Sequence, residues 1–156
     1  MNRRQCLVLV GAAPWALACR KKTPPPEERV RALMASVESA IEAGDVATVR
    51  EVLSPLFSGN ENLDKPGAMA MLQLRLRARK QIFLLTRVMD VDAVPGQLAG
   101  AELMVAMAAV PIPGPEALPN LEADVYRFQI ALEEDADAPH GYRVKSAAWS
   151  PARWPL

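Results

Sequence analysis

The period of the apolar residues changes once along this chain, from helical to strand-like, near Lys80. Before that point apolar residues recur every three or four positions, which is the spacing that lines one face of a helix. After it they form short runs and alternating patterns that are typical of strands. Helices followed by antiparallel strands predict an α+β domain, in which the helices pack on one face of a bent sheet.

Three helices are expected before Lys80. Apolar residues at helical spacing from Val30 to Ile41 predict the first, and Gly44 ends it because glycine readily takes the left-handed C-terminal conformation. Asp45 is a suitable N-cap for a second helix, which Ser54-Pro55 ends near residue 53. The apolar residues assigned to the second helix are Val46, Val49, Val52, Leu53 and Leu56.

A third helix opens at Asp64–Pro66, since proline fits the first helical turn. The remaining chain predicts four antiparallel strands. The clearest of them alternates Tyr126, Phe128 and Ile130 with polar residues. The four predicted strands cover residues 82–91, 101–110, 122–133 and 142–149.

The predicted strands contain the strings Leu85-Thr86-Arg87-Val88, Asp124-Val125-Tyr126-Arg127-Phe128 and Arg143-Val144-Lys145-Ser146-Ala147-Ala148-Trp149. These strings resemble the nuclear transport factor 2-like superfamily, which includes the ketosteroid isomerase-like and SnoaL-like proteins. The resemblance covers residues 28–150. It implies a cone-shaped fold with three N-terminal helices packed on a strongly curved antiparallel sheet of about four strands. A cavity at the wide end, and often a homodimer, are implied as well.

The lining of that cavity is predicted from the inward faces of the helices and strands. Methionine is frequent among these positions, and its flexible side chain suits an adaptable apolar pocket as well as an ordinary core. The expected occupant is a small apolar molecule. The predicted lining residues are Met34, Met69, Leu72, Arg87, Leu103, Met107, Tyr126 and Phe128.

The first residues resemble the leader of a bacterial lipoprotein. Arg3-Arg4 precedes a short apolar run, and small residues stand directly before Cys19. The run is too short to cross ~30 Å of hydrocarbon as a helix, and Pro14 would break it. We therefore expect residues 1–18 to be a signal peptide and Cys19 to be lipidated. An ordinary signal peptide with a chance cysteine and an N-terminal transmembrane anchor are the alternatives.

The lipid predicts a location in the cell envelope, on the periplasmic side. Lipoproteins retained in the inner membrane commonly carry aspartate after the lipidated cysteine. Here that residue is Arg20, so the resemblance favours the outer membrane. Residues 19–28 are expected to form a tether, which three prolines stiffen, and residues 29–152 the folded domain.

Nucleic acid, metal ions and cofactors are not expected as partners. Of the 18 basic residues, 16 follow the leader and face 18 acidic ones, so the domain has no excess of positive charge. The chain after Cys19 has a single histidine, His140, and no cysteine, which leaves no set of zinc ligands. Phosphate-binding loops and a Gly-x-Ser-x-Gly nucleophile motif are absent from the sequence.

Asp124 and Tyr126 are the candidates for catalysis. They share a strand face with Phe128, and apolar walls can raise the pKa of a cavity carboxylate until it exchanges protons. Arg87 is the expected ion partner of Asp124. The alternative is an ion pair that closes one end of the barrel, because buried charges are normally paired.

Two functions follow from the sequence. The first is a membrane-anchored, non-catalytic lipoprotein whose domain binds a small apolar ligand or a partner protein. The second is a cofactor-independent isomerase, hydratase or cyclase that uses Asp124 and Tyr126 as acid and base. A homodimer through the open face of the sheet is compatible with both.

Overall fold

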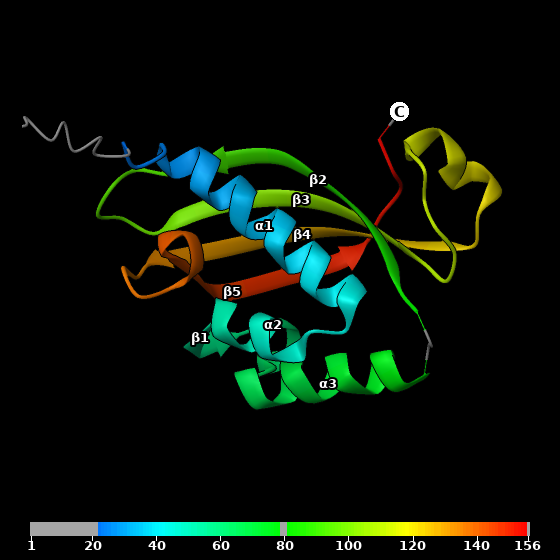
Figure 1. The fold of residues 1–156 in the computed structure, drawn as a ribbon, viewed down its shortest axis with the longest axis horizontal. Coiled ribbons are helices and arrows are strands. Elements are labelled where there is room, and N and C mark those ends of the chain that lie inside the picture. The colour runs from blue at the N-terminus through cyan, green and yellow to red at the C-terminus, as the bar shows by residue number, and fades with distance from the viewer. Residues whose placement is uncertain (1–21, 79–80, 156) are drawn as a thin grey trace, which may run out of the picture.

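A curved five-stranded sheet carries the fold in the computed structural model, which describes residues 22–78 and 81–155 (Figure 1). The strand order is β1-β5-β4-β3-β2. The predicted signal peptide and Cys19 lie outside the described residues. In chain order the elements are α1 (Pro26–Ala43), α2 (Val46–Val52), β1 (Leu53–Ser58), α3 (Lys65–Ala78), β2 (Phe83–Asp92), β3 (Ala99–Ala108), β4 (Ala123–Glu134) and β5 (Tyr142–Pro151), with 3-10 turns at Asn60–Asn62, Pro115–Asn120 and Pro139–Gly141.

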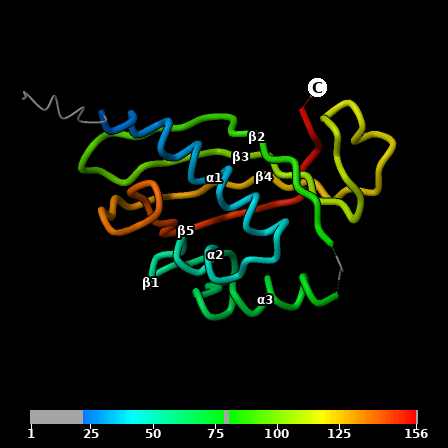
Figure 2. The backbone as a smooth tube through the Cα atoms, in the orientation of Figure 1, coloured from blue at the N-terminus to red at the C-terminus, as the bar shows by residue number. Residues whose placement is uncertain are grey.

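The helices lie on one side of the sheet. Figure 1 shows α1 running diagonally across this face, with α2 and α3 beside β1. Strands β2 to β5 form an antiparallel meander, and β1 adds to β5 in parallel. Figure 2 shows the connection between β3 and β4 projecting beyond the end of the sheet at which β4 begins. The expected α+β fold, with helices on one face of a curved sheet, is confirmed.

The local signals for the helix ends are confirmed. Gly44 takes the left-handed conformation after α1, with φ 70° and ψ 19°. The Asp45 side chain accepts a hydrogen bond from the Thr48 N–H at 3.1 Å and so caps α2. The second bond from the Thr48 hydroxyl helps to hold the pKa of Asp45 below its ordinary value.

The predicted tether is too long at its C-terminal end. Helix α1 starts at Pro26, so residues 26–28 belong to the helix. Proline fits the first helical position because the N–H that it lacks would have no partner there. Glu27 and Glu28 follow in the first turn, where negative charge complements the helix dipole.

The assignment of Leu53 and Leu56 to the second helix is wrong. Helix α2 ends at Val52, and both leucines lie on β1, a fifth strand that the sequence patterns did not predict. Pro55 ends the helix and is tolerated in β1 because this strand lies at the edge of the sheet, where a missing N–H disturbs no ladder on the open side. β1 exists through its pairing with β5, about 90 residues later, with Leu53 opposite Val144.

The core lies between α1 and the concave face of the sheet. Val30 and Leu33 of α1 are fully buried, and they belong to one apolar cluster with Leu132 of β4 and Tyr142 of β5. Leu56, by contrast, is 78% exposed. The two leucines of α1 and β1 therefore differ completely in environment.

Leu33→Ala is expected to lower the free energy of unfolding by about 2–5 kcal/mol, because it leaves a cavity under α1. Leu56→Ala removes the same atoms from the surface and should change the free energy of unfolding by no more than about 0.5 kcal/mol. Urea denaturation followed by circular dichroism measures both. Equal losses in the two variants would contradict the packing of α1 on the sheet.

Candidate functional site

An apolar cavity of about 250 Å³ lies between the helices and the concave face of the sheet. The helices and the segment around β1 supply one wall, which consists of Met34, Val37, Glu38, Ile41, Val49, Val52, Leu53, Phe57, Leu63, Ala68, Met69, Met71 and Leu72. Strands β2 to β5 supply the other wall, which consists of Leu84, Thr86, Leu103, Val105, Met107, Phe128, Ile130, Val144, Ala147 and Trp149. Apolar cavities of this kind stay dry and bind small apolar molecules.

Most of the residues predicted for the cavity wall lie on it. The structure brings together Met34, Met69, Leu72, Leu103, Met107 and Phe128. The helical and strand periods place these side chains inward, as the sequence patterns predict. Their contact with a ligand stays a prediction.

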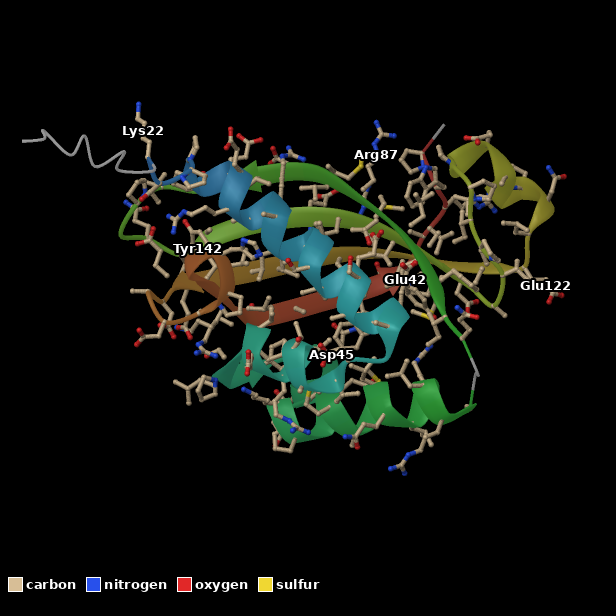
Figure 3. The ribbon with its side chains drawn as sticks, in the orientation of Figure 1. Lys22, Glu42, Asp45, Arg87, Glu122 and Tyr142 are labelled. Carbon is tan, nitrogen blue, oxygen red and sulfur yellow. The ribbon has the colours of Figure 1, made fainter. Side chains whose placement is uncertain are left out.

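Arg87 does not line the cavity. It stands opposite Met104 in the β2–β3 ladder, whereas the neighbouring pair Thr86 and Val105 faces the cavity. Since successive side chains of a strand point to opposite faces, Arg87 lies on the far side of the sheet. Figure 3 shows its side chain extending outward from β2, away from α2 and α3.

Tyr126 and Asp124 lie beyond the cavity along β4. Tyr126 is half-buried and makes an edge-on ring contact with Phe128, at 6.4 Å between ring centroids. Asp124 is exposed and stands opposite Met107. Arg87 and Asp124 therefore point to opposite faces of the sheet, and the expected ion pair between them does not form.

An ion pair between other residues lies where α1 begins and β4 ends. Arg29 of α1 lies 3.5 Å from the Glu134 carboxylate, and its guanidinium covers the Tyr142 ring at 4.7 Å. The Tyr142 hydroxyl donates to Glu134 at 3.3 Å. Burial raises the pKa of Tyr142, and the nearby Arg29 charge opposes that rise. Figure 3 shows Tyr142 beneath the N-terminal half of α1, at the opposite end of the molecule from Glu122.

Glu38 is a cavity residue that the sequence reasoning missed. It is the one carboxylate among the lining residues, and its Oε2 atom accepts the Thr86 N–H at 3.0 Å. Among the described residues nothing is hydrogen-bonded to its Oε1 atom. The signal in the sequence is its position one helical turn after Met34, which lines the same cavity.

Glu38 belongs to a row of side chains that fasten α1 to the edge strand β2. One turn further on, Glu42 accepts the Leu84 N–H at 2.8 Å. Arg31, at the other end of the row, donates to the Val88 carbonyl at 3.4 Å. These side chains give the backbone groups of an edge strand the partners that a further strand would otherwise provide.

Trp149 forms the part of the wall nearest the Asn60 turn. The Asn60 side chain accepts the backbone N–H of Trp149 at 3.1 Å and donates to the Trp149 carbonyl at 2.7 Å. A Cβ atom at Gly59 would lie only 3.1 Å from the Trp149 ring. The turn around Asn60 therefore positions an aromatic wall residue.

Residues 22–78 and 81–155 contain no group of three or more side chains that could hold a metal ion. None of the helices in these ranges combines the length and the apolarity needed to span a bilayer.

Comparison with known proteins identifies the fold. No protein-family model matches the sequence, and no curated protein matches it. A Nostoc punctiforme domain of unknown function with a cystatin-like fold superposes with a TM-score of 0.62 and 15% identity, covering 85% of this chain and 81% of that domain. A Streptomyces avermitilis protein, a candidate dehydratase of the nuclear transport factor 2-like family, superposes with a TM-score of 0.61 and 16% identity, covering 83% and 98%.

A third structure agrees with these two. A nuclear transport factor 2-like protein of unknown function from Shewanella oneidensis superposes with a TM-score of 0.59 and 12% identity, covering 81% of this chain and 99% of that protein. At such low identity these similarities show the fold alone. The chain has the nuclear transport factor 2-like, cystatin-like fold. This is the fold that the resemblance of its strand sequences implies.

Glu38→Ala is expected to lower the free energy of unfolding by about 1–3 kcal/mol, because it leaves the Thr86 N–H without a partner. Glu38→Gln keeps an acceptor oxygen at the same place and should cost less. Hydrogen exchange of the Thr86 amide, read by NMR, measures the contact directly. Unchanged exchange in Glu38→Ala would contradict the proposed fastening of α1 to β2.

Proposed function

We propose that the domain binds one small apolar molecule in the cavity between α1, α3 and the sheet. The observation that carries this proposal is the cavity wall itself, in which Glu38 and Thr86 are the polar side chains apart from the Trp149 indole. A volume of about 250 Å³ limits the ligand to a small molecule or to the apolar part of a larger one.

Binding without catalysis accounts best for the residues around the cavity. The lining contains no histidine, cysteine or serine, and Glu38 and Thr86 supply its carboxylate and its hydroxyl. Asp124 and Tyr126, the pair considered for acid-base chemistry, are not among the lining residues. A binding domain requires only the apolar wall and a route for the ligand.

Naphthalene is expected to bind in the cavity, and Ala147→Leu should weaken this binding about tenfold, because the larger side chain fills the space. Ala148→Leu is the matched control, since Ala148 is the next residue and faces the other side of the sheet. NMR titration of both variants measures the affinity. Equal affinity in Ala147→Leu and the parent protein would place the ligand elsewhere.

We further propose that lipid on Cys19 anchors the protein in the cell envelope, on the periplasmic side and with preference for the outer membrane. The support is the leader sequence, with two arginines, a short apolar run and small residues before the cysteine. The proline-containing segment after Cys19 separates the lipid from α1.

Cys19→Ser is expected to abolish labelling with palmitate and to move the protein from the membrane fraction to the soluble fraction. Cys6→Ser is the matched control, because Cys6 lies within the predicted leader and should leave both properties unchanged. Metabolic labelling and cell fractionation provide the readout. Membrane association that survives Cys19→Ser would contradict the lipid anchor.

Acid-base catalysis at Glu38 is a second candidate function. Glu38 is the carboxylate that faces the apolar lining, and one of its oxygens has no hydrogen bond among the described residues. The candidate dehydratase among the structural neighbours shares the fold. Loss of water from small β-hydroxy carbonyl compounds tests this function, and Glu38→Gln should abolish any such turnover while naphthalene still binds.

A homodimer through the open face of the sheet is the quaternary state that we propose. The resemblance to dimeric relatives is its support. Sedimentation equilibrium of the protein without its leader measures the mass, and a monomer at all concentrations would rule the dimer out.

A further inference from the structure

We propose that the groove between α2, β1 and α3 binds the anionic head of a single-chain amphiphile whose apolar part occupies the cavity. This inference deepens the proposed function and rests on it, since it names the chemical class of the ligand. The head is a carboxylate or a phosphate, and the apolar part is a short alkyl chain.

The groove is lined by cations without a carboxylate. Arg50 of α2 and Lys65 of α3 lie on its walls, together with Gln73 and the prolines Pro55 and Pro66. An amide and two cationic groups around one hollow supply hydrogen-bond donors and positive charge for a negatively charged group.

Neither of these cations has an ion partner among the described residues. The Lys65 Nζ atom donates to the Leu53 carbonyl at 2.8 Å, which leaves further N–H groups for a ligand. Arg143 lies close by, but Asp135 already neutralises it at 2.6 Å. Desolvation lowers the pKa of Lys65, and the charges of Arg143 and Arg50 lower it further. An anion in the groove would relieve this repulsion.

Met69 connects the groove to the cavity. Its side chain lines both hollows and is 5% exposed, so it forms the partition between them. Methionine is unbranched and changes rotamer readily, so a ligand can displace it at little cost. An alkyl chain that passes Met69 enters the apolar cavity, while the head of the ligand stays in the groove beside Arg50.

The charge of the cavity determines which end of the ligand enters. Glu38 lines the cavity on α1, against β2, whereas the cationic groove lies against β1. These two strands are the opposite edges of the sheet. A negatively charged head inside the cavity would lie near the Glu38 carboxylate, whereas the groove offers it two cations. The amphiphile therefore binds with its head in the groove.

Octanoate and octanol, which share one alkyl chain, test this proposal by calorimetric titration. Octanoate is expected to bind roughly tenfold more tightly, and the difference should shrink at high salt because the groove is open to solvent. Arg50→Gln and Lys65→Met should each weaken octanoate roughly threefold and leave octanol unchanged. Arg75→Gln is the matched control. Arg75 is an exposed cation of α3 and lies about 200° around the helix from Gln73, so its replacement should change the affinity for neither octanoate nor octanol.

Charge reversal provides a gain-of-function test that does not depend on lost stability. Arg50→Glu should weaken octanoate and strengthen octylamine, because the groove then carries a negative charge where it carried a positive one. Equal affinities for octanoate and octanol would overturn the proposal of an anionic head. An octanoate affinity that neither Arg50 variant changes would overturn it as well. The proposal of an apolar ligand would be unaffected by either result. Failure of octanol and naphthalene alike would overturn the proposed function and this inference with it.

Titration with inorganic phosphate distinguishes recognition of an amphiphile from recognition of a free anion. We expect phosphate to bind much more weakly than octanoate and to compete with it, because it lacks the chain. Phosphate that binds as tightly as octanoate would show that the groove recognises a free anion. This result would overturn the proposal that the ligand is an amphiphile.

Discussion

The attachment of α1 to the edge strand β2 is the interaction on which the rest of the structure depends. A helix has no free backbone groups along its length, so it cannot extend a sheet as another strand would. Glu38 and Glu42 accept N–H groups of β2 in place of a strand, and Arg31 donates to a β2 carbonyl. Side chains thus fasten α1 along this edge of the sheet, and the concave face beneath the helix is not completely filled.

The cavity and the charges around it follow from this arrangement. α1 covers the middle of the sheet, α3 lies beside β1, and the remaining space between them is apolar. The charged groups lie at its margins, because a carboxylate or a cation loses its hydration when it is buried without a partner. Glu38 accepts a β2 N–H at one margin, and Lys65 donates to a β1 carbonyl at the other. A ligand that is apolar in the middle and polar at one end matches this distribution.

Local signals predicted most of the fold and part of the site. Gly44 and Asp45 marked a helix end and a helix start correctly, and strand alternation placed Leu103 and Phe128 on the inner face. The prediction assigned Arg87 to the wrong face of the sheet, because an error of one residue along a strand moves a side chain to the other face. β1 was missed because it forms through pairing with β5, a contact between distant residues that the local pattern does not contain.

The sequence by itself determined the class of fold and most of the inward faces of its helices and strands, and it predicts a lipid anchor at Cys19. Each of these depends on residues that are neighbours along the chain, where period, capping and spacing act directly. Only the tertiary structure decided that Glu38 lines the cavity, that Arg29 pairs with Glu134, and that Met69 separates an apolar cavity from a cationic groove. These relations join residues far apart in sequence, and they exist only once the strands have paired and α1 is fastened across them.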